Sequence, residues 1–183
     1  MQHAFMEEMA QRLASRGIAT FRYQFPYMEK RFRRPDPQPV LLSTVRSAVE
    51  EAKRLGGSVP LFAGGKSMGG RMTSLAAASG TMAGVRGIVF FGFPLHPPGK
   101  PGTARAKHLS DVKLPMLFLQ GTRDKLADLD LLRPICAALP GAELHIVEGG
   151  DHSFSALKRS GRTADEVFEG LAGTVADWIT RTV

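Results

Sequence analysis

The stretch Val59–Arg71, "VPLFAGGKSMGGR", leads an apolar run into a glycine cluster that holds a lysine and a serine. Two kinds of loop use such a sequence. A phosphate-binding loop has the spacing G-x-x-x-x-G-K-[ST], and its backbone amides surround the phosphates. A nucleophile elbow has the pattern G-x-S-x-G, and it exposes a serine on a sharp turn between a strand and a helix.

The spacing favours the elbow. Counting back from Gly65, the first glycine of a phosphate loop should be residue 60, but Pro60 stands there. Gly65-Lys66-Ser67-Met68-Gly69 matches the elbow pattern, and the glycines at 64, 65, 69 and 70 are expected to keep the turn clear of the adjacent strand and helix. Ser67 is therefore the candidate nucleophile, with a helix N-cap as its ordinary alternative role.

Apolar runs and amphipathic segments alternate outward from this turn. The predicted strands, some with their exit turns, are Ile18–Phe25, Val59–Gly65, Gly87–Pro94, Leu114–Asp124 and Ala142–His152. The predicted helices cover residues 5–13, Val40–Gly57, Met68–Gly80, Asp128–Leu139 (with Pro134 in its first turn or at a kink) and Thr163–Thr182. Continuously apolar strands are typical of a sheet that is covered on both faces. The fold class is thus α/β, with a mostly parallel sheet flanked by helices.

Candidate site residues follow the strands, because ligands bind at the carboxyl ends of parallel strands. These exits hold Ser67, His96, Asp124 and His152. A serine triad on this kind of fold has the chain order Ser, Asp or Glu, then His. Ser67, Asp124 and His152 fit that order: Ser67 would attack, His152 would take its proton, and Asp124 would orient the imidazole.

Other residues compete for these roles or could support them. Asp128 is a rival acid, and Asp151 is a weaker one because it is adjacent to His152. His96 is a rival base that the order rule disfavours, and we expect it to line a substrate pocket or to have a structural role. Lys66 either faces the mouth of that pocket and attracts an acidic substrate, or is solvated. The Met68 amide, directly after the nucleophile, is the expected oxyanion donor.

The composition limits the remaining classes of function. The 183 residues suffice for one substantial core, carry a net charge of +7 and include a single cysteine, Cys136, which suits a reducing, cytoplasmic location. No apolar run approaches the roughly 20 residues of a membrane span. Metal-ligand spacing and a dinucleotide-binding G-x-G-x-x-G are both missing from the sequence, so we expect no metal and no cofactor. The basic run Glu29–Pro37 lacks the aromatic platform of a strand-binding groove, and nucleic acid is not an expected partner.

Four motifs carry a family resemblance: "GGKSMGGR", "GFPLHPPGKP", "FLQGTRD" and "GGDHSF". With them the chain resembles α/β-hydrolases of the dienelactone-hydrolase-related group. It is similar in particular to bacterial relatives of testis-expressed protein 30 and of the third subunit of the NSL histone-acetyltransferase complex. The resemblance implies a hydrolase fold over the whole chain. It also implies further strands at the start, one of which ends in a loop that supplies a second oxyanion amide.

We therefore expect residues 1–183 to form a single α/β-hydrolase domain that lacks those first strands through a truncated or misassigned start, or that repairs its sheet as a homodimer. The predicted activity is that of a serine hydrolase acting on an ester, thioester or related acyl bond of a small molecule. The alternative is a non-catalytic protein-interaction module on the same scaffold.

Overall fold

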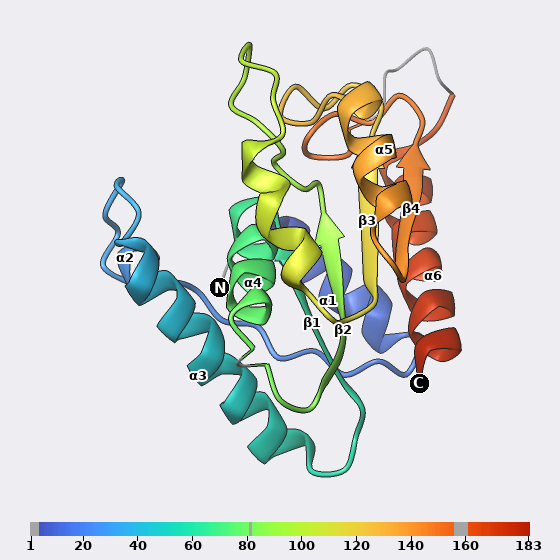
Figure 1. Ribbon diagram of the computed structural model, residues 1–183. Coiled ribbons are helices and arrows are strands. Elements are labelled where there is room, and N and C mark those ends of the chain that lie inside the picture. Colours follow the sequence, from blue (N-terminus) through green and yellow to red (C-terminus); the bar gives the residue numbers. More distant parts are fainter. Residues whose placement is uncertain (1–3, 81, 156–160) are drawn as a thin grey trace.

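A parallel sheet of four strands forms the centre of the computed structural model, which describes residues 4–80, 82–155 and 161–183 (Figure 1). The strands lie side by side in chain order: β1 Leu61–Lys66, β2 Val85–Phe91, β3 Met116–Gly121 and β4 Ala142–Val147. Every neighbouring pair is parallel, so all four carboxyl ends lie at the same edge of the sheet. The α/β class with a parallel sheet is confirmed.

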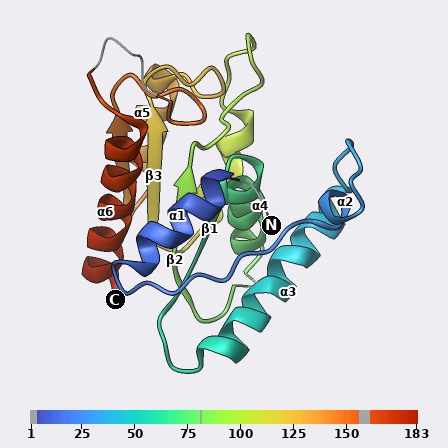
Figure 2. The same ribbon diagram turned by 180° about the vertical axis from the view of Figure 1, so that it is seen from behind.

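Helices cover both faces of the sheet. On one face lie α1 Ala4–Ala14 and α6 Ala164–Thr182 (Figure 2), and their apolar residues form one core with those of β2 and β3. The second core contains residues of α3 Gln38–Gly56, α4 Met68–Ala78, the 3-10 helix η1 Ala104–Asp111 and α5 Leu129–Ala138. The short helix α2, Pro26–Glu29, precedes α3.

Central and edge strands differ in burial. All of β3, and all of β2 except Arg86, are buried, as expected for strands covered on both faces. In β4, by contrast, exposed and partly buried residues alternate, and β1 is largely half-buried with Gly64 exposed. Covering on both faces therefore describes the two central strands only.

The expected strand Ile18–Phe25 is not a strand in the structure. Among the described residues, β1 pairs with β2 alone, so no ladder includes this segment. Two of its aromatic residues pack instead: Phe25 is buried in the core beside α3 and α4, and the Tyr23 and Phe25 rings meet edge to face at 5.9 Å. Burial also raises the pKa of Tyr23 to about 12. An apolar run of this length cannot by itself distinguish a paired strand from an extended packed segment.

Helix ends are set by local sequence, with one correction. Thr163 and Glu166 form a capping box at the start of α6. Asp128 caps α5, and its side chain accepts a hydrogen bond from the Asp130 amide at 2.9 Å. Pro134 lies inside α5 and beyond its first turn, so of the two expected placements the first turn is wrong and a kink remains. Burial of Cys136 in the same helix raises the pKa of its thiol to about 12, as suits a small buried hydrophobe.

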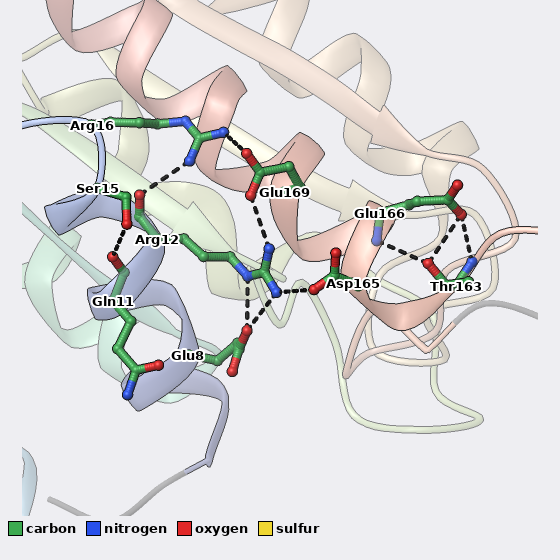
Figure 3. A network of polar contacts seen from close by, with 9 residues as sticks. All are labelled: Glu8, Gln11, Arg12, Ser15, Arg16, Thr163, Asp165, Glu166 and Glu169. Atoms are coloured by element: carbon green, nitrogen blue, oxygen red, sulfur yellow. Dashed lines mark hydrogen bonds and ion pairs between the residues drawn. The ribbon is translucent and has the colours of Figure 1, made fainter.

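An arginine network joins α1 to α6 (Figure 3). The Arg12 guanidinium lies between Glu8 at 2.6 Å, Asp165 at 2.5 Å and Glu169 at 2.9 Å, and Arg16 also pairs with Glu169. The hydrogen bonds that Arg12 donates to the Asp165 and Glu8 carboxylates raise the pKa of Arg12. Exposed single pairs add little stability, but several charges that share one arginine fix the two helices against each other.

Candidate active site

Ser67 occupies the turn between β1 and α4. Its backbone has φ 52° and ψ −119°, a conformation that L-residues rarely adopt and that costs about 1–3 kcal/mol. The Ser67 amide donates to the Phe91 carbonyl of β2 at 3.0 Å, which helps to hold the strained residue. The side chain makes no capping bond to the helix, so its hydroxyl is available for another partner.

Close backbone contact explains three of the glycines around Ser67. A Cβ atom on Gly65 would lie 2.8 Å from the Gly70 nitrogen, and one on Gly70 would lie 2.8 Å from the Gly65 carbonyl oxygen. A Cβ on Gly64 would meet the Val89 carbonyl oxygen at 2.4 Å. Gly69 differs from the expectation, because an added Cβ there has no heavy atom within 4 Å. Steric clearance is therefore required at 64, 65 and 70, but not at 69.

The structure brings Ser67, His152 and Asp124 together from three different strand exits. Ser67 Oγ lies 2.8 Å from His152 Nε2, and His152 Nδ1 lies 2.7 Å from Asp124 Oδ2. Because a carboxylate only accepts, Nδ1 carries the proton that is donated to Asp124, and Nε2 is left to accept from the Ser67 hydroxyl. The arrangement can thus remove a proton from the serine oxygen.

Two donors besides His152 hold the Asp124 carboxylate. The Leu126 amide donates to Oδ1 at 2.8 Å, and Gln120 Nε2 donates to Oδ2 at 2.5 Å. Both the Asp124 side chain and Gln120 are fully buried, and Gln120 Oε1 has no hydrogen-bond partner among the described residues. Sequence reasoning missed Gln120, although a lone polar residue at the end of the apolar run "LPMLFLQG" was a usable signal.

Hydrogen bonds to the Asp151 side chain hold the loop that carries His152 in place. Asp151 Oδ1 accepts from the Ser153 amide at 2.8 Å and from the Ser155 amide at 2.9 Å. Asp151 is therefore occupied within the loop and is not the acid that contacts the imidazole. Phe154 has a positive φ of 63° and is buried beneath the loop.

His96 and Asp128 are joined by a hydrogen bond that lies apart from the Ser67 site. The His96 ring is buried; its Nε2 accepts from the Asp128 amide at 2.9 Å, and its Nδ1 donates to the Pro97 carbonyl at 2.9 Å. Both ring nitrogens are used within the protein, which agrees with the structural role that was one of the two expectations for His96. Asp128 caps α5, so neither rival residue takes part in the Ser67 site.

Lys66 lines a surface hollow between α1, α6 and the loop of His152, and its ammonium group also has partners within the protein. Its ammonium group donates to the His152 carbonyl oxygen and lies 5.3 Å from the Phe5 ring centroid and 5.4 Å from that of Phe154. Burial lowers the pKa of Lys66 to about 8, against an opposing effect of the Asp124 and Asp151 carboxylates.

Met68 is the first residue of α4. The first four amides of a helix have no intrahelical acceptor, and the helix dipole places partial positive charge there. A negative oxygen next to Ser67 would lie at this helix terminus, consistent with the expected role of the Met68 amide.

A second serine–histidine contact lies deeper in the protein. Ser74 Oγ on α4 is 2.7 Å from His108 Nε2 on η1, and it also donates to the Arg71 carbonyl at 3.0 Å. Burial, followed by the charge of Arg71, lowers the pKa of His108 to about 4. This contact was not predicted. Of the other histidines, His145 lies on β4, and His3 is outside the described residues.

Within the described residues, no group of three or more His, Cys, Asp or Glu side chains could hold a metal ion. A search of the same residues finds no helix with the length and apolarity that a bilayer crossing requires.

Comparison with known proteins identifies the family. The model of the alpha/beta hydrolase domain family matches residues 1–180, so the chain belongs to that family. A dienelactone hydrolase from Anabaena variabilis is similar in structure, with a TM-score of 0.74 and 19% identity over 100% of this chain and 81% of that one. An α/β serine hydrolase without a lid from Xanthomonas campestris gives 0.71 and 19%, covering 99% of this chain and 74% of that one.

Est1E from Butyrivibrio proteoclasticus, in a structure with bound ferulic acid, gives a TM-score of 0.72 and 14% identity over 99% of this chain and 84% of that one. At these identities the likeness concerns the fold. The structure, the family and these neighbours agree on a hydrolase scaffold.

Proposed function

We propose that this protein is a serine hydrolase that cleaves an ester, thioester or related acyl bond of a small molecule through an acyl-enzyme. The observation that carries the proposal is the unbroken hydrogen-bonded series from Ser67 through His152 to Asp124, with distances of 2.8 and 2.7 Å. Nucleophile and base in hydrogen-bond contact, with a third group orienting the base, is the pattern that activates a serine hydroxyl.

In the first half-reaction, Ser67 Oγ attacks the acyl carbon while its proton moves to His152 Nε2. The carbonyl electron pair becomes an oxyanion, which the Met68 amide stabilises at the start of α4. The oxyanion collapses, the bond to the leaving group breaks, and Nε2–H gives its proton to that group. A water molecule then attacks the acyl-enzyme by the same steps, releasing the acid and restoring the Ser67 hydroxyl.

Asp124 holds the His152 imidazole in the tautomer that these reaction steps require. While His152 carries two protons, the buried carboxylate stabilises its positive charge. The bonds from Gln120 and Leu126 keep the carboxylate in place, so the imidazole does not have to reorganise during the reaction.

The fold neighbours support an acyl substrate, because they include a dienelactone hydrolase and a serine hydrolase. The motifs quoted above also lead us to propose kinship with bacterial relatives of testis-expressed protein 30 and of the NSL complex subunit. The single buried cysteine fits a reducing compartment, and we propose that the protein acts in the cytoplasm.

The test is pre-steady-state hydrolysis of p-nitrophenyl acetate and butyrate. A serine hydrolase should release a burst of nitrophenol of about one equivalent per active site if deacylation is slow, and turnover should disappear in Ser67→Ala. Circular dichroism of both proteins controls for folding. A folded wild-type protein that neither turns over these esters nor forms an adduct with a serine-reactive phosphonate would instead favour the interaction module.

A further inference from the structure

We propose that Lys66 is a positioning residue for the catalytic base, and that its charged ammonium group ties the His152 loop to the strand that carries Ser67. The inference rests on the proposed function, and it adds a role for a lysine that the reaction scheme does not use.

The first support is that Lys66 connects the two segments that carry the reacting side chains. Lys66 is the last residue of β1 and directly precedes Ser67. Its Nζ donates to the main-chain carbonyl oxygen of His152, 86 positions along the chain. One hydrogen bond therefore spans the strand of the nucleophile and the loop of the base, and it restrains the separation of Ser67 Oγ and His152 Nε2.

The second support is the aromatic environment of the ammonium group. The ring centroids of Phe5 and Phe154 lie 5.3 and 5.4 Å from Nζ, within the range of cation–π attraction. The two rings stack on each other at 5.7 Å, and both residues are buried. Both rings attract the positive charge of an ammonium ion but not a neutral amine. The link between β1 and the His152 loop therefore depends on the charge of Lys66.

The elements around Lys66 are themselves fixed. Phe5 lies on α1, which the Arg12 network of Figure 3 joins to α6, and Phe154 lies in the loop that Asp151 orders. The charged groups near Lys66 are Asp124 and Asp151 from the strand exits. The surface hollow that Lys66 lines is also lined by Glu8 and Arg12 of α1 and by Asp165 of α6. The acids at the strand exits favour the charged ammonium, and burial opposes it.

A pH dependence follows from this balance. With the pKa of Lys66 lowered to about 8, the ammonium is charged at neutral pH and loses its proton within the working range of the assay. Loss of the charge removes the cation–π attraction and weakens the bond to the His152 carbonyl. The positioning effect is therefore complete at neutral pH and is lost as the pH rises through about 8, and kcat should fall on the alkaline side.

The experiment measures kcat and KM of p-nitrophenyl acetate hydrolysis from pH 6 to 10, corrected for spontaneous hydrolysis, for wild type, Lys66→Arg and Lys66→Met. Wild type should show an alkaline limb near pH 8. Lys66→Arg should keep most of the activity at pH 7 and lack that limb, since guanidinium stays charged. Lys66→Met should lose about tenfold or more in kcat at pH 7, with KM little changed, and show no limb near pH 8.

Two controls separate positioning from folding. Lys53→Met removes an exposed lysine that pairs with Glu50, and its profile should match that of wild type. Phe5→Leu removes one ring and should move the wild-type limb to lower pH by about half a unit. Thermal unfolding of every variant is measured alongside; if Lys66→Met does not fold, the Lys66→Arg profile decides.

An alkaline limb near pH 8 that is equal in wild type, Lys66→Arg and Lys66→Met would overturn the proposal, as would a folded Lys66→Met with wild-type kcat. In both cases the Ser67-dependent burst would persist, so the proposed function would stand. A folded wild-type protein with neither Ser67-dependent turnover nor a phosphonate adduct would instead reject the proposed function, and the role of Lys66 with it.

Discussion

Two serine–histidine pairs in this molecule have almost the same separation and very different surroundings. Ser67 Oγ lies 2.8 Å from His152 Nε2, and Ser74 Oγ lies 2.7 Å from His108 Nε2. Both serines are associated with α4, where Ser67 directly precedes the helix and Ser74 lies within it. A distance criterion alone would rate the two contacts as equal.

The direction of the hydrogen bonds separates the pairs. The Ser74 hydroxyl donates its hydrogen bond to the Arg71 carbonyl oxygen. The His108 ring must therefore donate to Ser74 Oγ rather than accept from it. His152 donates to Asp124 from its other nitrogen and can accept from Ser67. Within the part of the chain that the structure describes, no carboxylate is hydrogen-bonded to His108.

Charge and access separate them as well. Burial and then the charge of Arg71 lower the pKa of His108 to about 4, which makes its imidazole a poor base. Ser74 is fully buried in a regular helix, whereas Ser67 is partly exposed on a strained turn. The comparison shows that a reactive pair needs the third group, the free acceptor nitrogen and an exposed hydroxyl together.

The largest expected difference is between two alanine variants. Ser67→Ala should lower kcat/KM for p-nitrophenyl esters by about 10⁴-fold or more, because the nucleophile is lost. Ser74→Ala should leave kcat/KM within about threefold of wild type, since Ser74 only bonds within the core. Equal losses in two folded variants would break the distinction between the pairs.

Asp124→Asn should come next, with kcat reduced by about 10³- to 10⁴-fold. The asparagine amide would donate toward His152 Nδ1, so the imidazole would carry its proton on Nε2 and could not accept from Ser67. The bonding would then resemble that of His108. Steady-state kinetics at pH 7 measure the effect, and Asp128→Asn, which alters only the cap of α5, serves as the matched control.

The glycines of the elbow give a smaller effect, on stability. Gly70→Ala should destabilise the fold by about 1–3 kcal/mol, because its Cβ would meet the Gly65 carbonyl oxygen at 2.8 Å. Gly69→Ala meets no atom within 4 Å and should be neutral or stabilise α4 by up to about 1 kcal/mol. Urea unfolding of the Gly70→Ala and Gly69→Ala variants measures both free energies of unfolding. A greater loss of stability in Gly69→Ala than in Gly70→Ala would contradict the packing described for the turn.

His108 should produce the smallest effect, a dependence of stability on acid. Its pKa is about 4 when folded and near 6.5 when unfolded, so the unfolded chain binds more protons between these values. The free energy of unfolding should therefore fall as the pH is lowered from about 6.5 to 4. His108→Gln should weaken this fall relative to wild type when urea unfolding is compared at pH 7 and pH 5. An identical fall in both proteins would show that His108 is not held neutral.

Local sequence was enough to predict the class of fold and the four strands that pair. The G-x-S-x-G spacing and the residues after the strands also identified the three side chains that the structure brings together. Ile18–Phe25 was misassigned because pairing depends on a neighbouring strand, and no window of sequence contains that information. Lys66, His96, Gln120 and the Ser74–His108 contact needed the tertiary structure, since their partners lie on loops and helices that are distant in the chain.

The most direct test of the central claim is the site of covalent modification by a fluorophosphonate. The folded wild-type protein is treated at pH 7, digested, and analysed by peptide mass spectrometry. The account predicts one adduct per chain, on Ser67, and none on Ser74. An adduct on Ser74, or a folded protein that stays unmodified at Ser67, would contradict it.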